Sequence, residues 1–233
     1  MNIIITGASK GIGKAVAEVF AARGHTLYLC ARNETVLSAT VSELALQYPT
    51  AVIQSKVADM TDSNDRKIFA VWVLKTAKKI DILVNNAGHF IPGSIHNEQS
   101  GILEQMISSN LYSAYHLTRL FITEMIQQKS GHIFNLCSIA SLHAYDNGGS
   151  YSISKFALLG FSKNLREEMK PHGIKVTAVL PGATLSDSWA GSGVDPNRIM
   201  EASDVAQMIL AASLLSPQAV VEDIIMRPQL GDL

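Results

Sequence analysis

The sequence predicts an α/β fold in which a doubly wound parallel sheet carries helices on both faces. Short apolar runs alternate with longer helical patterns along the chain, as β-α-β units do. Several apolar runs are continuous rather than alternating, among them residues 3–5 and 82–84, so these strands are expected to be buried on both faces. Together these observations predict a three-layer, Rossmann-like sandwich around about seven strands.

The predicted elements follow one another without a repeat or a linker. Gly24 and Gly173 mark helix ends, and Ser203 marks a helix start. The predicted strands cover residues 2–6, 26–30, 52–57, 80–85, 132–136, 175–180 and 220–226. The predicted helices cover residues 13–23, 33–48, 62–78, 98–128, 150–170 and 203–216.

Composition indicates one globular domain over residues 1–233 and argues against several functional classes. Of the 233 residues, 47% are hydrophobic and 17% are charged, and the net charge is −1. This charge offers no basic field for nucleic acid, and no run reaches the roughly 18 apolar residues that span a bilayer. We therefore expect neither a nucleic-acid partner nor a membrane partner.

The cysteines and the first residues indicate a cytoplasmic protein. Cys30 and Cys137 are too few for a disulfide framework or a zinc site, and the histidines show no metal-ligand spacing. A strand signal follows Met1 directly, without a basic and apolar leader, so no signal peptide is expected. We predict no metal.

A glycine-rich loop follows the first predicted strand. Its spacing over residues 7–13 is G-x-x-x-G-x-G, and a helix comes next. Glycines let a backbone approach a ligand closely, and a helix N-terminus offers free N–H groups to a pyrophosphate. Ala15 stands where a Walker A motif needs a magnesium-binding hydroxyl, which excludes that motif. The loop therefore predicts a dinucleotide site, and a tight turn without a ligand is the alternative.

The end of the second predicted strand indicates which dinucleotide binds. Ala31 occupies the position where NAD enzymes carry a carboxylate, and Arg32 follows it. An arginine pairs well with a 2′-phosphate, and Lys10 in the glycine loop adds a second positive charge. These charges favour NADP(H) over NAD(H), unless Arg32 is merely a solvated loop residue.

Three residues predict the chemistry. Tyr151 and Lys155 lie four residues apart at the start of a predicted helix, so they share a face. An ammonium group stabilises a nearby phenolate, which suits a phenol to proton transfer. Ser138 follows the strand at residues 132–136, and its hydroxyl can polarise a carbonyl there. The trio predicts an oxidoreductase for a carbonyl/alcohol pair, with Ser138 and Tyr151 also contacting the substrate.

In this order the motifs resemble the short-chain dehydrogenase/reductase family along essentially the full chain. The loop Thr6-Gly7-x-x-x-Gly11-x-Gly13 and the stretch at residues 85–88 (NNAG) carry the resemblance together with the trio. The resemblance implies that Asn110 holds a water in a proton relay and that Asp59 touches adenine. It also implies that such enzymes are homodimers or homotetramers.

The resemblance completes the expected site. It implies that Lys155 also binds the nicotinamide ribose and that the loop after residue 180 meets the nicotinamide amide. The expected catalytic residues are Asn110, Ser138, Tyr151 and Lys155. The expected cofactor-binding residues are Gly7, Ser9, Lys10, Gly11, Ile12, Gly13, Arg32, Asp59, Met60, Asn86, Ala87, Gly88, Tyr151, Lys155, Pro181, Gly182 and Thr184.

The substrate is expected to meet a short loop at about residues 183–200. Its glycines and serines suggest a mobile lid, in which Trp189 either covers a flat substrate or pins the loop to the body. The C-terminus resembles that of sepiapterin-reductase-like members, in which an acidic residue anchors the pterin. Asp232 is a candidate by position, with subunit packing as its alternative role. A 3-oxoacyl thioester is the other candidate substrate.

Three functions compete at this point. The first hypothesis is an active carbonyl reductase, the second is an NADP(H)-binding sensor without turnover, and the third is a structural subunit that binds no ligand. The intact set of Ser138, Tyr151 and Lys155 favours the enzyme, because a sensor has no need to keep all three.

Overall fold

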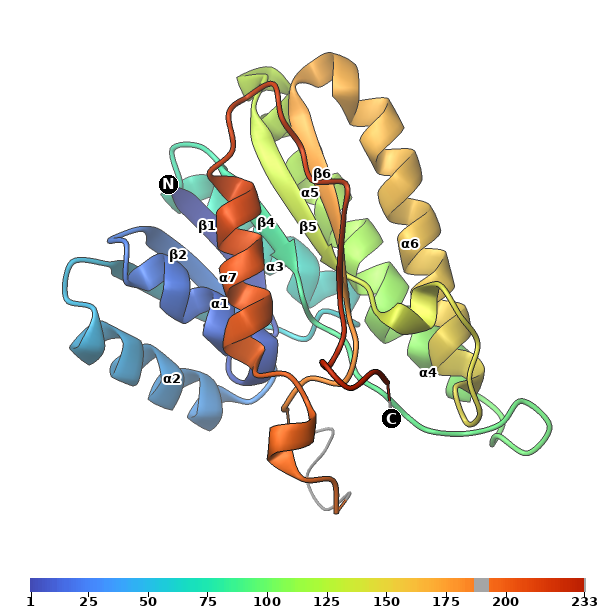
Figure 1. The fold of residues 1–233 in the computed structure, drawn as a ribbon. Helices are drawn as coiled ribbons and strands as arrows, with labels where there is room; N and C mark the ends of the chain where they lie inside the picture. Colours follow the sequence, from blue (N-terminus) through green and yellow to red (C-terminus); the bar gives the residue numbers. More distant parts are fainter. Residues whose placement is uncertain (187–192, 233) are drawn as a thin grey trace.

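The computed structural model describes residues 1–186 and 193–232, and its centre is a seven-stranded sheet of order β3-β2-β1-β4-β5-β6-β7. All neighbouring strands are parallel, which confirms the predicted doubly wound fold (Figure 1). The strands are β1 (Asn2–Thr6), β2 (Thr26–Ala31), β3 (Val52–Val57), β4 (Ile82–Asn85), β5 (Gly131–Leu136), β6 (Ile174–Pro181) and β7 (Asp223–Met226). The strand order reverses between β1 and β4, where such sheets bind ligands.

Helices cover both faces of the sheet. Helices α1, α2 and α7 pack on one face, and α3, α5 and α6 pack on the other. The helices are α1 (Gly11–Ala21), α2 (Glu34–Gln47), α3 (Ser63–Thr76), α4 (Ile102–Ile107), α5 (Ser113–Gln128), α6 (Gly149–Met169) and α7 (Ala202–Ser213). None of the described helices is long and apolar enough to cross a membrane.

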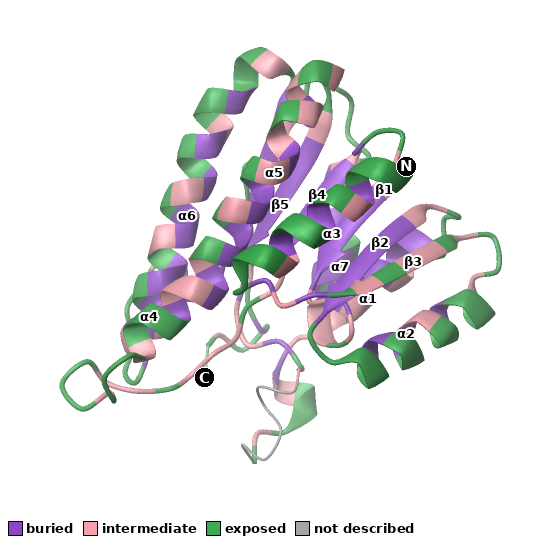
Figure 2. Ribbon diagram, turned by 180° about the vertical axis from the view of Figure 1, so that it is seen from behind, coloured by how far each residue is buried: buried purple, intermediate pink, exposed green. Residues whose placement is uncertain are grey.

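Strand β1 shows why continuous apolar runs predicted the architecture. Ile3 and Ile5 point into the core under α1 and α7, and Ile4 points into the core under α3 and α5. All three side chains are 0% exposed. Figure 2 shows the central strands buried along their length between helices with exposed outer faces. A strand covered on both faces has no polar positions to alternate with.

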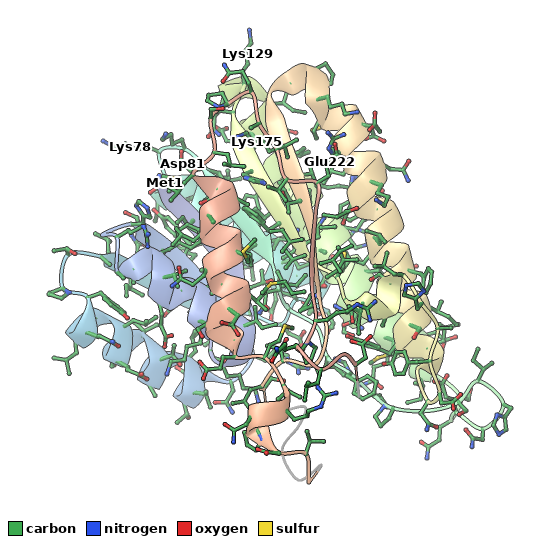
Figure 3. The ribbon with its side chains drawn as sticks, viewed as in Figure 1. Met1, Lys78, Asp81, Lys129, Lys175 and Glu222 are labelled. Atoms are coloured by element: carbon green, nitrogen blue, oxygen red, sulfur yellow. The ribbon has the colours of Figure 1, made fainter. Side chains whose placement is uncertain are left out.

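The two ends of the sheet differ in character. Figure 3 shows the charged side chains of Asp81, Lys129 and Lys175 near the amino ends of β4, β5 and β6. At the carboxyl ends the chain instead forms the glycine loop and the segments that follow β4, β5 and β6. The candidate site lies at this second end, as expected for a parallel sheet with helical crossovers.

The predicted helix over residues 98–128 is helical only from Ile102 and contains a π-helical turn, so the prediction is wrong in its start and in its regular α-helical form. Helix α4 ends at Ile107, a π-helical turn occupies Ser108–Tyr112, and α5 begins at Ser113. The helix also begins later than predicted, because Gly101 adopts a left-handed conformation with φ 93°. Turns of this kind are frequent at functional sites. Here the turn contains Asn110.

Candidate active site

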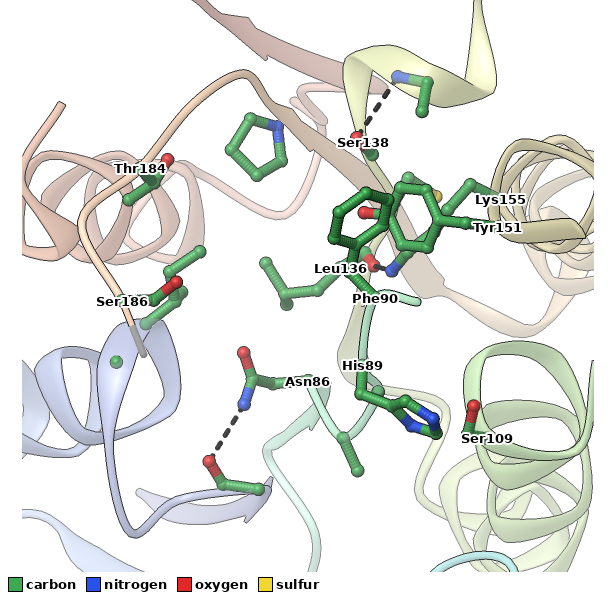
Figure 4. A pocket seen from close by; sticks show the side chains of 18 of the residues that line it. Asn86, His89, Phe90, Ser109, Leu136, Ser138, Tyr151, Lys155, Thr184 and Ser186 are labelled. Atoms are coloured by element: carbon green, nitrogen blue, oxygen red, sulfur yellow. Dashed lines mark hydrogen bonds between the residues drawn. The ribbon is translucent and has the colours of Figure 1, made fainter. Parts of the chain in front are cut away.

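A cavity of about 1030 Å³ opens at the carboxyl ends of the strands and collects most of the predicted site residues (Figure 4). Its walls come from the ends of β1, β2, β3, β4, β5 and β6 and from the C-terminal tail. The predicted residues that line it are Gly7, Ser9, Lys10, Gly11, Ile12, Arg32, Asp59, Met60, Asn86, Ala87, Gly88, Ser138, Tyr151, Lys155, Pro181, Gly182, Thr184 and Asp232.

The glycine loop has little room for side chains. Gly7 and Gly11 adopt φ values of 62° and 54°, which favour glycine. Gly13 does not line the cavity but lies beneath the loop, where a Cβ would overlap the carbonyl oxygen of Gly7. The first residues of α1, Gly11 and Ile12, do line it, and the helix has no side-chain cap. An uncapped helix N-terminus behind a glycine cradle suits a pyrophosphate.

Thr6 and Asn86 join this loop to the segment after β4. The hydroxyl of Thr6 accepts hydrogen bonds from the N–H groups of Asn86 at 3.0 Å and Ala87 at 2.9 Å. The Asn86 amide donates to the carbonyl oxygens of Thr6 at 2.9 Å and Gly7 at 3.0 Å. Asn86 therefore shapes the glycine loop as well as lining the cavity.

Arg32 lies exposed at the end of β2, on the wall that Asp59 also lines. Asp59 is held by Thr61, whose N–H and hydroxyl donate to its carboxylate at 2.8 and 2.7 Å. Burial, and after it the charge of Arg32, lowers the pKa of His89 in the neighbouring wall. Because Arg32 itself lines the cavity, its positive charge is available to an anion bound there.

Ser138, Tyr151 and Lys155 meet at the end of β5. Lys155 Nζ donates to the carbonyl oxygen of Leu136 at 2.6 Å and lies 5.7 Å from the centroid of the Tyr151 ring. The Ser138 hydroxyl accepts from the N–H of Ala140 at 3.1 Å, which leaves its proton available to an acceptor in the cavity. Figure 4 shows the three side chains at one end of the cavity.

Asn110 lies behind the cavity wall and is 1% exposed. Its side-chain oxygen accepts from the N–H of His89 at 3.0 Å, and its amide donates to the His89 carbonyl oxygen at 3.1 Å and to the Ser154 hydroxyl at 2.9 Å. The π-helical turn thus directs Asn110 between the segment after β4 and the helix that carries Tyr151. The structure shows Asn110 as a link between two walls.

The segment after β6 and the C-terminal tail form the remaining wall. The N–H of Gly182 donates to the carbonyl oxygen of Met226 at 2.8 Å. Asp232 forms an ion pair with Arg227, and both residues line the cavity. Arg198 holds the tail from below by donating to the carbonyl oxygen of Gly231 at 3.0 Å. Trp189, the other substrate candidate, lies outside the described residues.

Sequence reasoning missed several lining residues. Phe90 packs its ring edge-on against Tyr151, with centroids 4.9 Å apart. His89, Tyr145 and Arg227 also line the cavity. For His89 and Phe90 a signal existed, because they directly follow the NNAG stretch. For Tyr145 and Arg227 none existed, because both depend on how a loop and the tail fold back. Among the described residues no group of three potential ligands is arranged to hold a metal.

Comparison with known proteins identifies the family. The family model described as short chain dehydrogenase matches residues 1–196. The chain belongs to the short-chain dehydrogenase family. This short-chain dehydrogenase is 30% identical over 237 residues to a sepiapterin reductase of Chlorobaculum tepidum, covering 99% of this chain and 97% of that protein. Membership makes the chain an oxidoreductase that uses a nicotinamide cofactor, as the sequence predicts, and argues against a purely structural subunit.

Two other similarities are informative. A monensin polyketide synthase putative ketoacyl reductase of Streptomyces virginiae is 36% identical over 181 residues, covering 77% of this chain and 69% of that one. A metagenomic short-chain oxidoreductase solved in complex with NADP superimposes with a TM-score of 0.84 at 29% identity, covering 98% of this chain and 97% of the other. The likeness extends over the fold that positions the cavity.

Proposed function

We propose that this short-chain dehydrogenase uses NADP(H) to interconvert a carbonyl and an alcohol on a small or medium substrate. The observation that carries the proposal is that Ser138, Tyr151 and Lys155 line the same cavity as the glycine loop and Arg32. When bound, the nicotinamide supplies or accepts the hydride. The cofactor is expected to contact the predicted cofactor-binding residues that line this cavity. Gly13 does not line it but packs against the carbonyl oxygen of Gly7 and so supports the glycine loop.

Each member of the trio has a distinct role in this proposal. Tyr151 donates its phenolic proton to the carbonyl oxygen in reduction and takes it back in oxidation. Ser138 donates a hydrogen bond to the same oxygen. Lys155, anchored on the Leu136 carbonyl oxygen at 2.6 Å, places a positive charge beside the phenol and stabilises its ionised form. Asn110 is proposed to complete the relay through a water, and this is supported by its position beside Gly88 in the cavity wall, which Lys155 Nζ also adjoins.

The direct test is NADPH oxidation with a panel of carbonyl compounds, followed by absorbance. The panel contains sepiapterin, vicinal diketones and an acetoacetyl thioester. Turnover with at least one of them is expected. Tight NADPH binding without turnover across the panel would instead support an NADP(H) sensor.

Arg32→Ala is expected to weaken NADPH binding about tenfold and to leave NADH binding unchanged. The reason is that a guanidinium adds a charge-assisted hydrogen bond to the 2′-phosphate, which NADH lacks. Isothermal titration with both cofactors measures the effect. The matched control is Lys67→Ala, which removes an exposed positive charge from α3. Equal affinities of the wild type for NADPH and NADH would contradict the proposed preference.

The full-length similarity to a sepiapterin reductase favours a pterin carbonyl as the substrate. Asp232 supports this choice, because its carboxylate lines the cavity beside Gly182 and can accept hydrogen bonds from a pterin. Trp189 is a further proposed substrate contact. A 3-oxoacyl thioester is the second candidate, which the similarity to a putative ketoacyl reductase favours. The panel above separates the two.

We further propose a cytoplasmic homodimer or homotetramer. Both cysteines are buried free thiols, which suits a reducing compartment. The outer surfaces of α4 and α6 expose the large apolar side chains of Leu103, Ile153 and Phe156, which a second subunit can cover. Light scattering of the purified protein is expected to give two or four times the monomer mass.

A further inference from the structure

Helix α6 carries Tyr151 and Lys155, yet its own sequence provides no cap. Its N-cap residue is Gly148, which makes no side-chain hydrogen bond, and Gly149 follows. The first N–H groups of a helix find no partner inside the helix, so buried ones need a partner elsewhere. Ser150 is 2% exposed, and its N–H therefore cannot rely on water.

Glu98, 52 residues earlier in the chain, provides the missing partner. One carboxylate oxygen accepts from the N–H of Ser150 at 2.8 Å, and the other accepts a short hydrogen bond from the Ser150 hydroxyl. A Cβ on Gly149 would overlap this carboxylate, so only glycine lets it sit against the backbone. A negative charge also suits the positive end of a long helix. Both carboxylate oxygens thus hold the residue directly before Tyr151.

The segment that contains Glu98 contacts the start of α6 at further points. The N–H of Gly93 donates to the carbonyl oxygen of Asn147, and the Ser94 hydroxyl donates to the Asn147 side-chain oxygen, both at 3.0 Å. Phe90 packs edge-on against Tyr151. In Figure 1 the same segment runs from the end of β4 past the amino end of α6. The wall after β4 and the proton donor are therefore held as one unit.

We propose that Glu98 is a positioning residue for the reaction: its two hydrogen bonds to Ser150 fix the first turn of α6 and, with it, the phenol of Tyr151. The inference rests on the proposed role of Tyr151. Proton transfer requires the donor to be within hydrogen-bond reach of the carbonyl oxygen, and small displacements of a reacting group cost large factors in rate. A residue that only capped the helix would affect stability and leave the chemical step alone.

Two substitutions separate these possibilities. Glu98→Ala removes both hydrogen bonds and is expected to lower kcat about tenfold. It should also lower the Tm by about 3 °C, as the loss of a cap does, and leave the NADPH dissociation constant within about twofold. Glu98→Gln keeps an oxygen for the Ser150 N–H and an amide that the Ser150 hydroxyl can accept from, so it should restore kcat to within about threefold of the wild type. Glu104→Ala, an exposed carboxylate on α4, is the matched control and should change nothing.

Hydrogen exchange gives a readout that needs no substrate. In Glu98→Ala, amides at residues 148–155 should exchange faster, whereas those at residues 160–169 should keep their wild-type protection. Faster exchange with an unchanged kcat would reduce Glu98 to a structural cap, and unchanged exchange would refute the anchoring itself. Absence of wild-type turnover would refute the proposed function, while the exchange comparison still decides whether Glu98 anchors α6.

Discussion

Tyr151→Phe is expected to lower kcat about 10³-fold, because it removes the only proton that the proposed mechanism delivers to the carbonyl oxygen. The substitution deletes one hydroxyl and keeps the ring, so the edge-on contact with Phe90 is retained. The loss should therefore appear in kcat, with the Tm and the NADPH dissociation constant close to those of the wild type. Steady-state kinetics with the best substrate of the panel measures it.

Tyr145→Phe is the matched control for this prediction. Tyr145 also lines the cavity, and burial raises the pKa of its phenol to about 12, which makes it a poor proton donor at neutral pH. Its substitution should leave kcat within about twofold of the wild type. A large loss in Tyr145→Phe together with a small one in Tyr151→Phe would transfer the role of proton donor to the loop after β5.

Between pH 6.5 and about 3, acid is expected to destabilise the fold by roughly 5 kcal/mol through one buried histidine, His132. The side chain is 5% exposed and stacks on Phe134 at 3.9 Å between centroids. The Thr177 hydroxyl has a single proton and donates it to the Val221 carbonyl oxygen at 2.5 Å, so His132 Nε2 must donate to Thr177 at 2.7 Å. The unprotonated Nδ1 is buried and finds no partner among the described residues.

The sign of the effect follows from this arrangement. Burial lowers the pKa of His132 from 6.5 to about 3, because a proton on Nδ1 would create a buried charge and a donor without an acceptor. Above pH 6.5 both the folded and the unfolded chain keep this residue neutral. As the pH falls from 6.5 towards 3, His132 binds a proton in the unfolded chain but stays neutral in the folded chain. Stability from this residue is therefore lost across that window.

Urea unfolding at pH 7.5, 6, 5 and 4 tests the prediction. His132→Gln keeps a donor for Thr177 and cannot titrate, so its free energy of unfolding should fall less steeply with acid than that of the wild type. The exposed His96→Gln serves as the control and should follow the wild-type curve. Parallel curves for the wild type and His132→Gln would contradict the assignment.

The strands were predictable because strands buried on both faces appear in the sequence as short, continuous apolar runs. The bounds of β1 and β3 agree with the prediction, and the other strands differ by a few residues at their ends. Most of the predicted site residues also meet in one cavity, because parallel strands end at the same edge of the sheet. The last predicted strand was too long, since β7 begins at Asp223.

The parts that could not be predicted depend on contacts between distant segments. The sequence places Glu98 inside a predicted helix. In the structure the left-handed Gly101 makes α4 begin at Ile102, so Glu98 lies in the preceding loop and can accept a hydrogen bond from Ser150. Arg227 forms an ion pair with Asp232, and Arg198 donates a hydrogen bond to the carbonyl oxygen of the same residue. The hydrophobic periodicity of the sequence does not predict either contact. These contacts are set by tertiary packing rather than by local sequence.

Because of the π-helical turn at Ser108–Tyr112, the position of Asn110 depends on the number of residues between α4 and α5 as well as on their identity. Deleting one residue there would allow a regular α-helix from α4 into α5, because a π-helical turn holds one residue more than the α-helical turn that it replaces. Met106 before the turn and Leu117 after it, both 0% exposed, would keep their places in the core, whereas the residues inside the turn would shift. A deletion in this turn, even of a residue other than Asn110, would thus move Asn110 away from His89 and Ser154 while the surrounding core stays in place.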